Sequence, residues 1–367
     1  MKKLFTIEIP ESRNFGLDLL RFFAIIFVLI NHGSGQLSKG LKPYNEYFFL
    51  DGVLLFFVLS GFLIGGIFIR TYQKGNLKSN IFNFWIRRWM RTLPAYYFTL
   101  FLICLLQYLT FRELDFNSVF KNFLFIQNSS EYDNYLFPEG WSLAIEEWFY
   151  LFLPILTLLF FTFFSDKKKA FLCVIFFIII LCPALRFLKH NLNPIINDAQ
   201  VWDENFRSIT PLRLDSIMFG VLGAFLHKYH PKLFFQSTTT KFIIGVIILI
   251  FIRLTDYFGN FSTVFKTTFS FSISSIGVFL MLPFLFSIKT PKNKYLVTFI
   301  TFTSLISYSL YLVNAKLVQG LILIHFDLNK PFYIKYLTYW ILTFMFGTFL
   351  YKFVELPFMR IRDKYFK

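Results

Sequence analysis

The 367-residue chain is 56% hydrophobic and 16% charged, and its mean hydropathy is +0.57. An ordinary soluble domain carries about 25% charged residues, so the composition excludes one and indicates an integral membrane protein. The net charge of +16 would favour nucleic acid binding in a soluble protein. Here the basic residues follow a membrane topology, so no nucleic acid partner is expected.

Apolar stretches of about 20 residues predict transmembrane helices. We expect about ten of them in an all-α, polytopic membrane helical bundle, built as a single membrane-embedded domain over residues 1–367 with no appended soluble domain. The expected spans are 15–35, 48–70, 93–111, 142–164, 170–188, 211–228, 241–257, 267–288, 296–315 and 332–354. With both termini in the cytoplasm, inner segments carry about twice as many Lys and Arg residues as outer ones, which is the bias expected of that orientation.

The first span carries two ionisable side chains, Arg21 and His32, which are costly to bury in hydrocarbon without a use. Their spacing places them within about 20° of one helix face and roughly 16 Å apart along the axis. We interpret them as residues at two depths of one site that crosses the bilayer. Asp18 either forms a structural ion pair with Arg21, three residues later, or orients it towards a bound anion.

Three arginines, Arg87, Arg88 and Arg91, lie in a predicted loop before the third span, where Pro94 is expected in the first helical turn. Basic residues at an inner membrane boundary usually contact lipid headgroups. Guanidinium groups at this density also suit a polyphosphate, so both interpretations stay open. In the second span, the small residues at 60–66 predict close helix packing.

The fourth span opens with a motif that contains Ser142, Glu146 and Tyr150, spaced four residues apart on one helix face. Glu146 is about as deep in the membrane as His32. We therefore expect its carboxylate to hold the imidazole while the other ring nitrogen takes a proton. The polar segment 112–141 before this span is expected to form a lid or an acceptor-facing loop.

Other buried charges have a structural interpretation beside the functional one. Glu146 and Glu147 are adjacent, and two buried carboxylates do not both stay charged without partners, so Arg21 or Arg213 would pair with one of them. Arg213 and Asp215 in the sixth span form either a buried ion pair or a wall of the same cavity. The cysteines lack the spacing of a metal site, and no metal is expected.

Taken in this order, the motifs resemble acyltransferase family 3, and the resemblance covers nearly the whole chain. They are Gly16-Leu-Asp-Leu-Leu-Arg21 with ten residues before His32, the segment 56–63, Arg87-Arg88-Trp-Met-Arg91, Trp141–Tyr150, Ser307-Tyr308-Ser-Leu-Tyr311-Leu, and Glu355-Leu-Pro357-Phe358. Asn314 stands where the family often has a second histidine.

The resemblance implies transfer of an acyl group, most often acetyl, from cytoplasmic acyl-CoA to a hydroxyl of a sugar or other acceptor. It implies that His32 is the catalytic base, that Glu146 is the first motif acid, and that Arg21, Arg87, Arg88 and Arg91 bind the donor. Our hypothesis is an acetyl-CoA-dependent O-acyltransferase, without a permanently bound cofactor, in the bacterial cytoplasmic membrane. Its acceptor would be a cell-surface polysaccharide or a lipid-linked precursor. Membrane lipids are expected as further binding partners.

Two other classes of protein fit the same residues. A secondary transporter of a glycan or lipid would use buried Arg, His and Glu for proton coupling, although no internal symmetry of the kind common in transporters is visible. A structural partner in a glycan assembly complex would need only paired charges. For the enzyme, an acyl-histidine intermediate is an alternative to base catalysis, and no oligomeric state is predicted.

Overall fold

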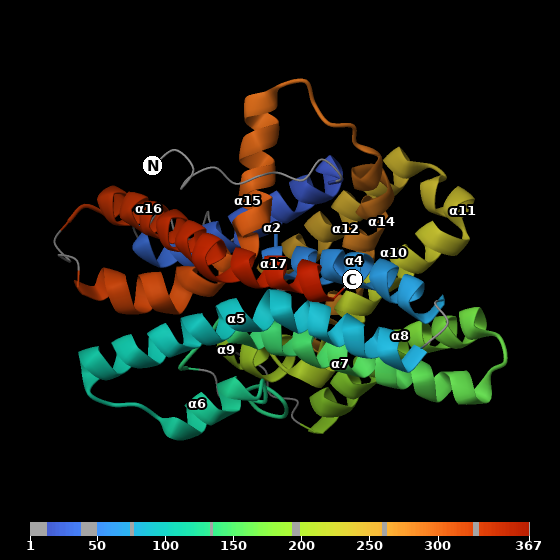
Figure 1. The fold of residues 1–367 in the computed structure, drawn as a ribbon, viewed down its shortest axis with the longest axis horizontal. Coiled ribbons are helices and arrows are strands. Elements are labelled where there is room, and N and C mark those ends of the chain that lie inside the picture. The colour runs from blue at the N-terminus through green and yellow to red at the C-terminus, as the bar shows by residue number, and fades with distance from the viewer. Residues whose placement is uncertain are drawn as a thin grey trace.

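The computed structural model describes residues 13–37, 50–73, 77–132, 135–192, 199–258, 263–325 and 330–366. Within these ranges the chain folds into helices and contains no strand, as the sequence predicts (Figure 1). The α-helices are α2 (Phe15–Gly33), α4 (Gly52–Gln73), α5 (Leu77–Phe111), α6 (Phe116–Phe123), α7 (Gly140–Phe163), α8 (Lys167–Leu192), α9 (Ala199–Trp202), α10 (Leu214–Tyr229), α11 (Pro231–Phe235), α12 (Thr238–Phe258), α13 (Thr263–Thr268), α14 (Ser270–Ser287), α15 (Lys294–Val313), α16 (Phe332–Leu350) and α17 (Leu356–Tyr365). The 3-10 helices are η1 (Ser34–Gln36), η3 (Thr210–Leu212) and η5 (Leu323–His325), and the π-helices are η2 (Asp203–Arg207), η4 (Asn314–Ile322) and η6 (Tyr351–Glu355).

In the described part of the chain, nine helices are long and apolar enough to cross a membrane. The predicted span 211–228 forms η3 and α10 instead, and α10 has 16 residues, fewer than the roughly 20 that cross a bilayer core. Most of its side chains are buried, and it packs against α4, α8 and α14. The protein is therefore a polytopic helical membrane protein.

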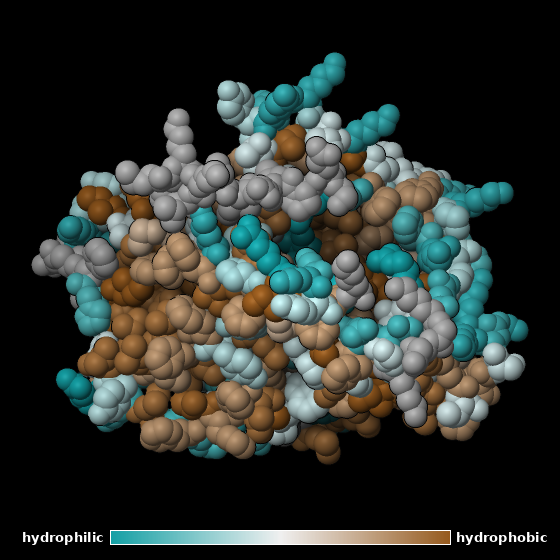
Figure 2. Space-filling model, viewed as in Figure 1, coloured by the Kyte–Doolittle hydropathy of each residue, from teal (hydrophilic) through white to brown (hydrophobic). Residues whose placement is uncertain are grey.

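The outer surface of the bundle is strongly apolar. Large side chains such as Phe101 on α5, Ile180 on α8 and Leu337 on α16 are 62%, 66% and 60% exposed. Figure 2 shows apolar side chains over much of the lower and left part of one face, with hydrophilic side chains gathered at the top and right. A soluble monomer rarely exposes apolar patches beyond a few hundred Å², so this surface suits lipid.

Helices α4 and α10 pack backbone against backbone, as the small residues of α4 predict. A Cβ on Gly61 would lie 1.8 Å from the carbonyl oxygen of Ile217, and one on Gly220 would lie 2.0 Å from that of Val58. This close crossing fixes α4 in the middle of the bundle, where its other faces line the site.

The loop predicted before the third span is wrong, because residues 77–111 form one continuous helix, α5. Pro94 lies inside this helix and not in its first turn. The segment before Pro94 is stabilised by contacts that hydropathy does not detect. Trp85 Nε1 donates to the carbonyl of Tyr150 at 3.0 Å, Trp85 stacks on Trp89, and α5 packs against α17.

The described residues of the segment before α7, 112–132 and 135–139, include hydrogen-bond partners of α5 and α7. The hydroxyl of Tyr96 donates to the carbonyl of Asn122 at 2.9 Å, and Trp148 Nε1 donates to that of Phe125 at 2.8 Å. Its role as a lid or an acceptor-facing loop stays a prediction.

The three π-helical segments, η2, η4 and η6, are unusual because π-helices are rare and often mark functional sites. Arg207, Asn314 and Glu355 lie in them, one in each. The ninth predicted span, 296–315, continues in the structure through η4 and η5 to His325. Helix α15 crosses α2 and α16 steeply in Figure 1 and ends at Val313, where η4 begins.

Candidate active site

A cavity of about 290 Å³, which we call the central cavity, lies between α2, α4, α5, α7 and α15. Its polar lining residues are Arg21, Ser60, Arg70, Arg88, Arg91, Thr92, Ser142, Glu146, Ser307, Tyr308 and Tyr311. Val53 and Arg70 both line it, and α4 rises roughly 25 Å between them. Since a bilayer core is about 30 Å thick, the central cavity follows α4 across most of the membrane.

Four of the lining side chains are arginines, and Glu146 is the one carboxylate among them. Three of the predicted donor-binding residues, Arg21, Arg88 and Arg91, therefore lie together around one cavity, as binding of one donor molecule would require. Arg70, on the last turn of α4, joins them without having been predicted. This excess of guanidinium groups favours an anionic ligand at that end of the cavity.

Arg87 lies apart from these arginines. Its guanidinium donates to the carboxylate of Asp363 at 3.2 Å and to the carbonyl of Phe366, after α17. It does not line the central cavity. The structure thus divides the predicted arginine cluster, because residues on successive positions of a helix point about 100° apart.

Asp18 forms the predicted ion pair with Arg21, at 3.6 Å. Its shorter contacts are with Arg13 and with the hydroxyl of Ser304, which donates to it at 2.7 Å. The carboxylate therefore joins the start of α2 to α15. It also reduces the cost of burying Arg21 beside the cavity.

Glu146 does not pair with His32, so the expected carboxylate–imidazole contact is wrong. The hydroxyl of Tyr150 donates to Glu146 at 2.6 Å and accepts from Arg88 at 2.9 Å. The Tyr150 hydroxyl also lies 2.6 Å from that of Ser60, and the Arg88 guanidinium lies over the Tyr150 ring at 4.5 Å. Glu146 therefore belongs to the arginine end of the central cavity.

The partner of His32 is Asn314, whose Oδ1 lies 2.6 Å from Nδ1 of the ring. The amide of Asn314 is oriented, because its Nδ2 donates to the carbonyls of Leu310 and Tyr311 at 3.2 and 2.7 Å. Oδ1 can then only accept, so Nδ1 of His32 carries the proton. In neutral His32 this leaves the lone pair on Nε2, which is the state of a general base.

His32 is half-buried and does not itself line the central cavity. Tyr311 connects the two, since it lines the cavity, and its carbonyl holds Asn314. Its hydroxyl lies 2.7 Å from that of Ser142, another lining residue, and donates to the carbonyl of Glu139 at 3.0 Å. The base and the cavity wall are therefore parts of one hydrogen-bonded network.

Glu139, just before α7, completes the network from outside the span. Its Oε1 accepts from the backbone N–H of Lys316 in η4 at 2.9 Å. Burial raises the pKa of the Glu139 carboxyl to about 7, although that hydrogen bond opposes the shift. Glu139 thus fixes η4, and with it Asn314, against the start of α7.

Glu147 and Asp215 have structural partners that differ from those expected. Glu147 accepts from the hydroxyl of Thr92 at 2.7 Å and does not pair with Arg21 or Arg213. Neither alternative for Arg213 and Asp215 holds, because they do not form an ion pair with each other and neither lines the central cavity.

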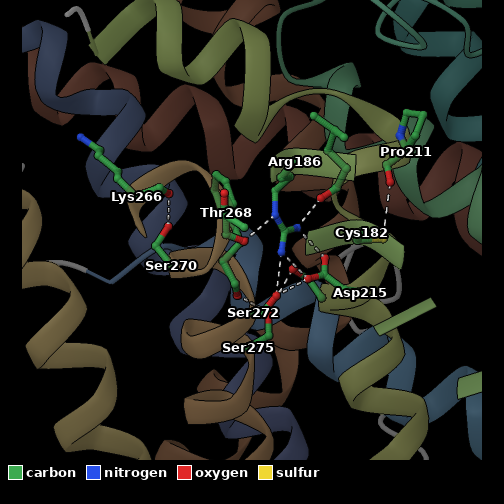
Figure 3. Close-up of polar contacts among 12 residues, drawn as sticks. Cys182, Arg186, Pro211, Asp215, Lys266, Thr268, Ser270, Ser272 and Ser275 are labelled. Carbon is green, nitrogen blue, oxygen red and sulfur yellow. Dashed lines mark hydrogen bonds and ion pairs between the residues drawn. The ribbon is translucent and has the colours of Figure 1, made fainter. Parts of the chain in front are cut away.

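Asp215 pairs with Arg186 of α8, and both side chains are 0% exposed. Figure 3 shows the Arg186 guanidinium between Asp215, Ser272 and the backbone carbonyl of Thr268. Arg186 is near the end of the expected span 170–188, and the packing of α8 on α10 and α13 buries it.

The family model for an acyltransferase domain matches residues 14–354, which is nearly the whole chain. The chain belongs to acyltransferase family 3. It is 28% identical to the O-acetyltransferase OatA of Staphylococcus aureus strain NCTC 8325, over 96% of this chain and 58% of that protein. It is 29% identical to a putative O-acetyltransferase of S. aureus strain COL, over 94% of this chain and 57% of that protein.

The chain thus spans less than two thirds of the length of the curated relatives it matches. No solved structure matches it.

Proposed function

We propose that this protein transfers an acyl group, normally acetyl, from acyl-CoA to a hydroxyl of a cell-surface polysaccharide or its lipid-linked precursor. The membrane would be the bacterial cytoplasmic membrane, with the arginine end of the central cavity on the cytoplasmic side. The observation that carries the proposal is the central cavity itself. It extends from four arginines to Tyr311, which holds the partner of His32.

The donor would bind with its phosphates at Arg70, Arg88 and Arg91. Guanidinium groups bind phosphate oxygens in bidentate geometry and keep their charge when buried. The pantetheine arm would then follow the apolar side chains of α4, such as Phe56 and Leu63, which line the cavity. This route brings the thioester towards Tyr311.

In the chemical step, Nε2 of His32 would remove the proton from the acceptor hydroxyl. The oxygen forms a bond to the thioester carbonyl carbon, the carbon–sulfur bond breaks, and the CoA thiolate takes the proton back from His32. General base catalysis contributes about 10²–10⁴-fold to a rate. Asn314 would supply the orientation that the sequence assigned to Glu146, whereas Glu146 would position Arg88 through Tyr150.

The test is acetyl transfer in proteoliposomes that contain the full chain, labelled acetyl-CoA and a sugar acceptor. We expect His32→Ala to lower the rate of ester formation about 100-fold or more. His325→Ala is the matched control, because His325 is an exposed histidine at the end of η5. Equal rates for His32→Ala and wild type would overturn the proposal, as would movement of the sugar without consumption of acetyl-CoA.

A further inference from the structure

A second cavity, of about 380 Å³, lies at the end of the bundle where α2 ends and α4 begins. We call it the end cavity. Its charged lining residues are Asp51, Asp203, Arg207, Arg213, Arg253 and Lys266. None of these residues lines the central cavity, so the end cavity is a separate space.

One arginine, Arg207, forms ion pairs with both carboxylates of the end cavity. Arg207 lies 2.7 Å from Asp203 and 3.5 Å from Asp51. Burial disfavours its charge, but the two carboxylates outweigh burial and raise the pKa of Arg207 above its ordinary value. The lining as a whole carries four cationic side chains and two carboxylates, so positive charge is in excess.

Arg213 is the most constrained of these cations. It is 1% exposed, and its Nε and Nη1 have no hydrogen-bond partner among the described residues. Its guanidinium lies 4.0 Å from the ring centroid of Phe271, and the nearby carboxylate of Asp215 is occupied by Arg186. Two buried N–H groups of a guanidinium without a hydrogen-bond partner are costly, so this side chain is arranged to donate to a ligand that enters the cavity.

Among the described residues, the other buried polar atoms of the lining without a hydrogen-bond partner are also donors. They are Nε1 of Trp202 and Nε of Arg253. Lys266 places its ammonium group 5.1 Å from the Trp202 ring, and Figure 3 shows it pointing away from the Arg186–Asp215 pair. A site with surplus donors and surplus positive charge recognises a carboxylate or a phosphate.

Phe57 lies between the two cavities. It is 0% exposed, it lines the central cavity, and its ring centroid is 5.8 Å from the guanidinium of Arg213. On the other side, Asn31 lines the end cavity and directly precedes His32. The end cavity therefore lies one helix position from the proposed base and outside the proposed path of the donor.

We propose that the end cavity is the acceptor site and that it selects an anionic saccharide, whose carboxylate or phosphate group binds Arg213. The acceptor role rests on the proposed acyl transfer, whereas binding of an anionic sugar does not.

The experiment measures binding by calorimetry, with the full chain in nanodiscs of phosphatidylcholine. The probes are methyl glucuronide, glucose 1-phosphate and neutral methyl glucoside. We expect the anionic sugars to bind at least tenfold more tightly than the neutral one, and the stronger of the two identifies the carboxylate or the phosphate as the natural group.

Two variants test the residues. Arg213→Gln should weaken anionic sugar binding tenfold or more, and Arg213→Lys should restore part of it. Because Arg213 is buried, Arg253→Gln combined with Lys266→Gln provides a test at more exposed positions, and it should also weaken binding. Arg112→Gln is the control, because Arg112 is an exposed arginine just after α5, and its affinity should match wild type.

Equal binding of the neutral and anionic sugars would overturn the inference, and so would wild-type affinity in both cavity variants. Loss of sugar binding when phosphatidylglycerol replaces phosphatidylcholine would also overturn it, since the cavity would then be a lipid headgroup site. Anionic sugar binding without any acyl transfer would refute the proposed function and leave the binding site intact.

Discussion

Replacement of Asn314 by alanine should slow acyl transfer without weakening donor binding. The variant removes the oxygen that accepts from Nδ1 of His32 at 2.6 Å, so the proton is free to move to Nε2 and the ring is free to rotate. Removing the partner of a buried polar group costs about 1–3 kcal/mol. At 1.4 kcal/mol per factor of ten, we expect kcat to fall about 5- to 140-fold.

The assay is initial-rate acetyl transfer in proteoliposomes, with acetyl-CoA varied at saturating acceptor. KM for acetyl-CoA should stay within about twofold, because Asn314 does not line the central cavity. The dependence of kcat on pH should also shift, since the environment of the imidazole has changed. A purely structural role for Asn314 would not move that profile.

Asn122→Ala is the matched control. Asn122 is also 0% exposed, and its amide donates to a backbone carbonyl, that of Ser118, at 2.9 Å. Its loss should reduce thermal stability without a comparable loss of kcat. If Asn314→Ala keeps the wild-type kcat and pH profile, or if Asn122→Ala loses as much activity, the orientation argument is refuted.

Three further predictions follow from other parts of the bundle. Arg91→Gln should raise KM for acetyl-CoA tenfold or more in the same assay, because it removes a charge-assisted donor, while Arg87→Gln should change it less than threefold; equal effects would contradict the assignment. Gly61→Ala should lower the stability of α4 packing by about 1–3 kcal/mol, measured as thermal unfolding in detergent, while Gly66→Ala, with no atom within 4 Å of the added Cβ, should not destabilise. Glu139 binds its proton more tightly in the folded state, so the free energy of unfolding should fall as pH rises from the ordinary carboxyl range to about 7. Melting curves of the Glu139→Gln variant should lack this fall. If the variant shows the same pH dependence of stability as wild type, the prediction is refuted.

Much of the fold could be predicted because long apolar runs leave few alternatives to membrane helices. The ends of the helices were harder to predict from the sequence. Residues 77–92 are too polar to count as a span, and their helix depends on contacts with α7 and α17 that only the folded chain provides. The same holds for α10, which is short but buried among its neighbours.

The site was predicted only in part. Depth along a helix can be calculated from sequence, which is why Glu146 and His32 seemed level, but the direction each helix faces depends on packing. Tyr150, four residues from Glu146 on the same helix, was correctly placed on its face, and it is the residue that bonds Glu146. Local spacing is therefore more reliable than a depth match between two helices.

Asn314 shows the limit most clearly. It is 282 residues from His32 in the chain, and in the sequence it stood out only as a departure from the family's frequent histidine. Arg186 is a similar case, because nothing near it in the sequence indicates Asp215 as its partner. Long-range pairs of this kind require the fold.

The most direct test of the central claim is the sidedness of the reaction, since one path is proposed to join the arginines to His32 across the bundle. Proteoliposomes with uniformly oriented protein would receive acetyl-CoA on one face and the sugar acceptor on the other. We predict that the ester forms when acetyl-CoA is on the face of Arg88 and the acceptor is on the face of His32. Ester formation only when both substrates are on the same face would contradict this account.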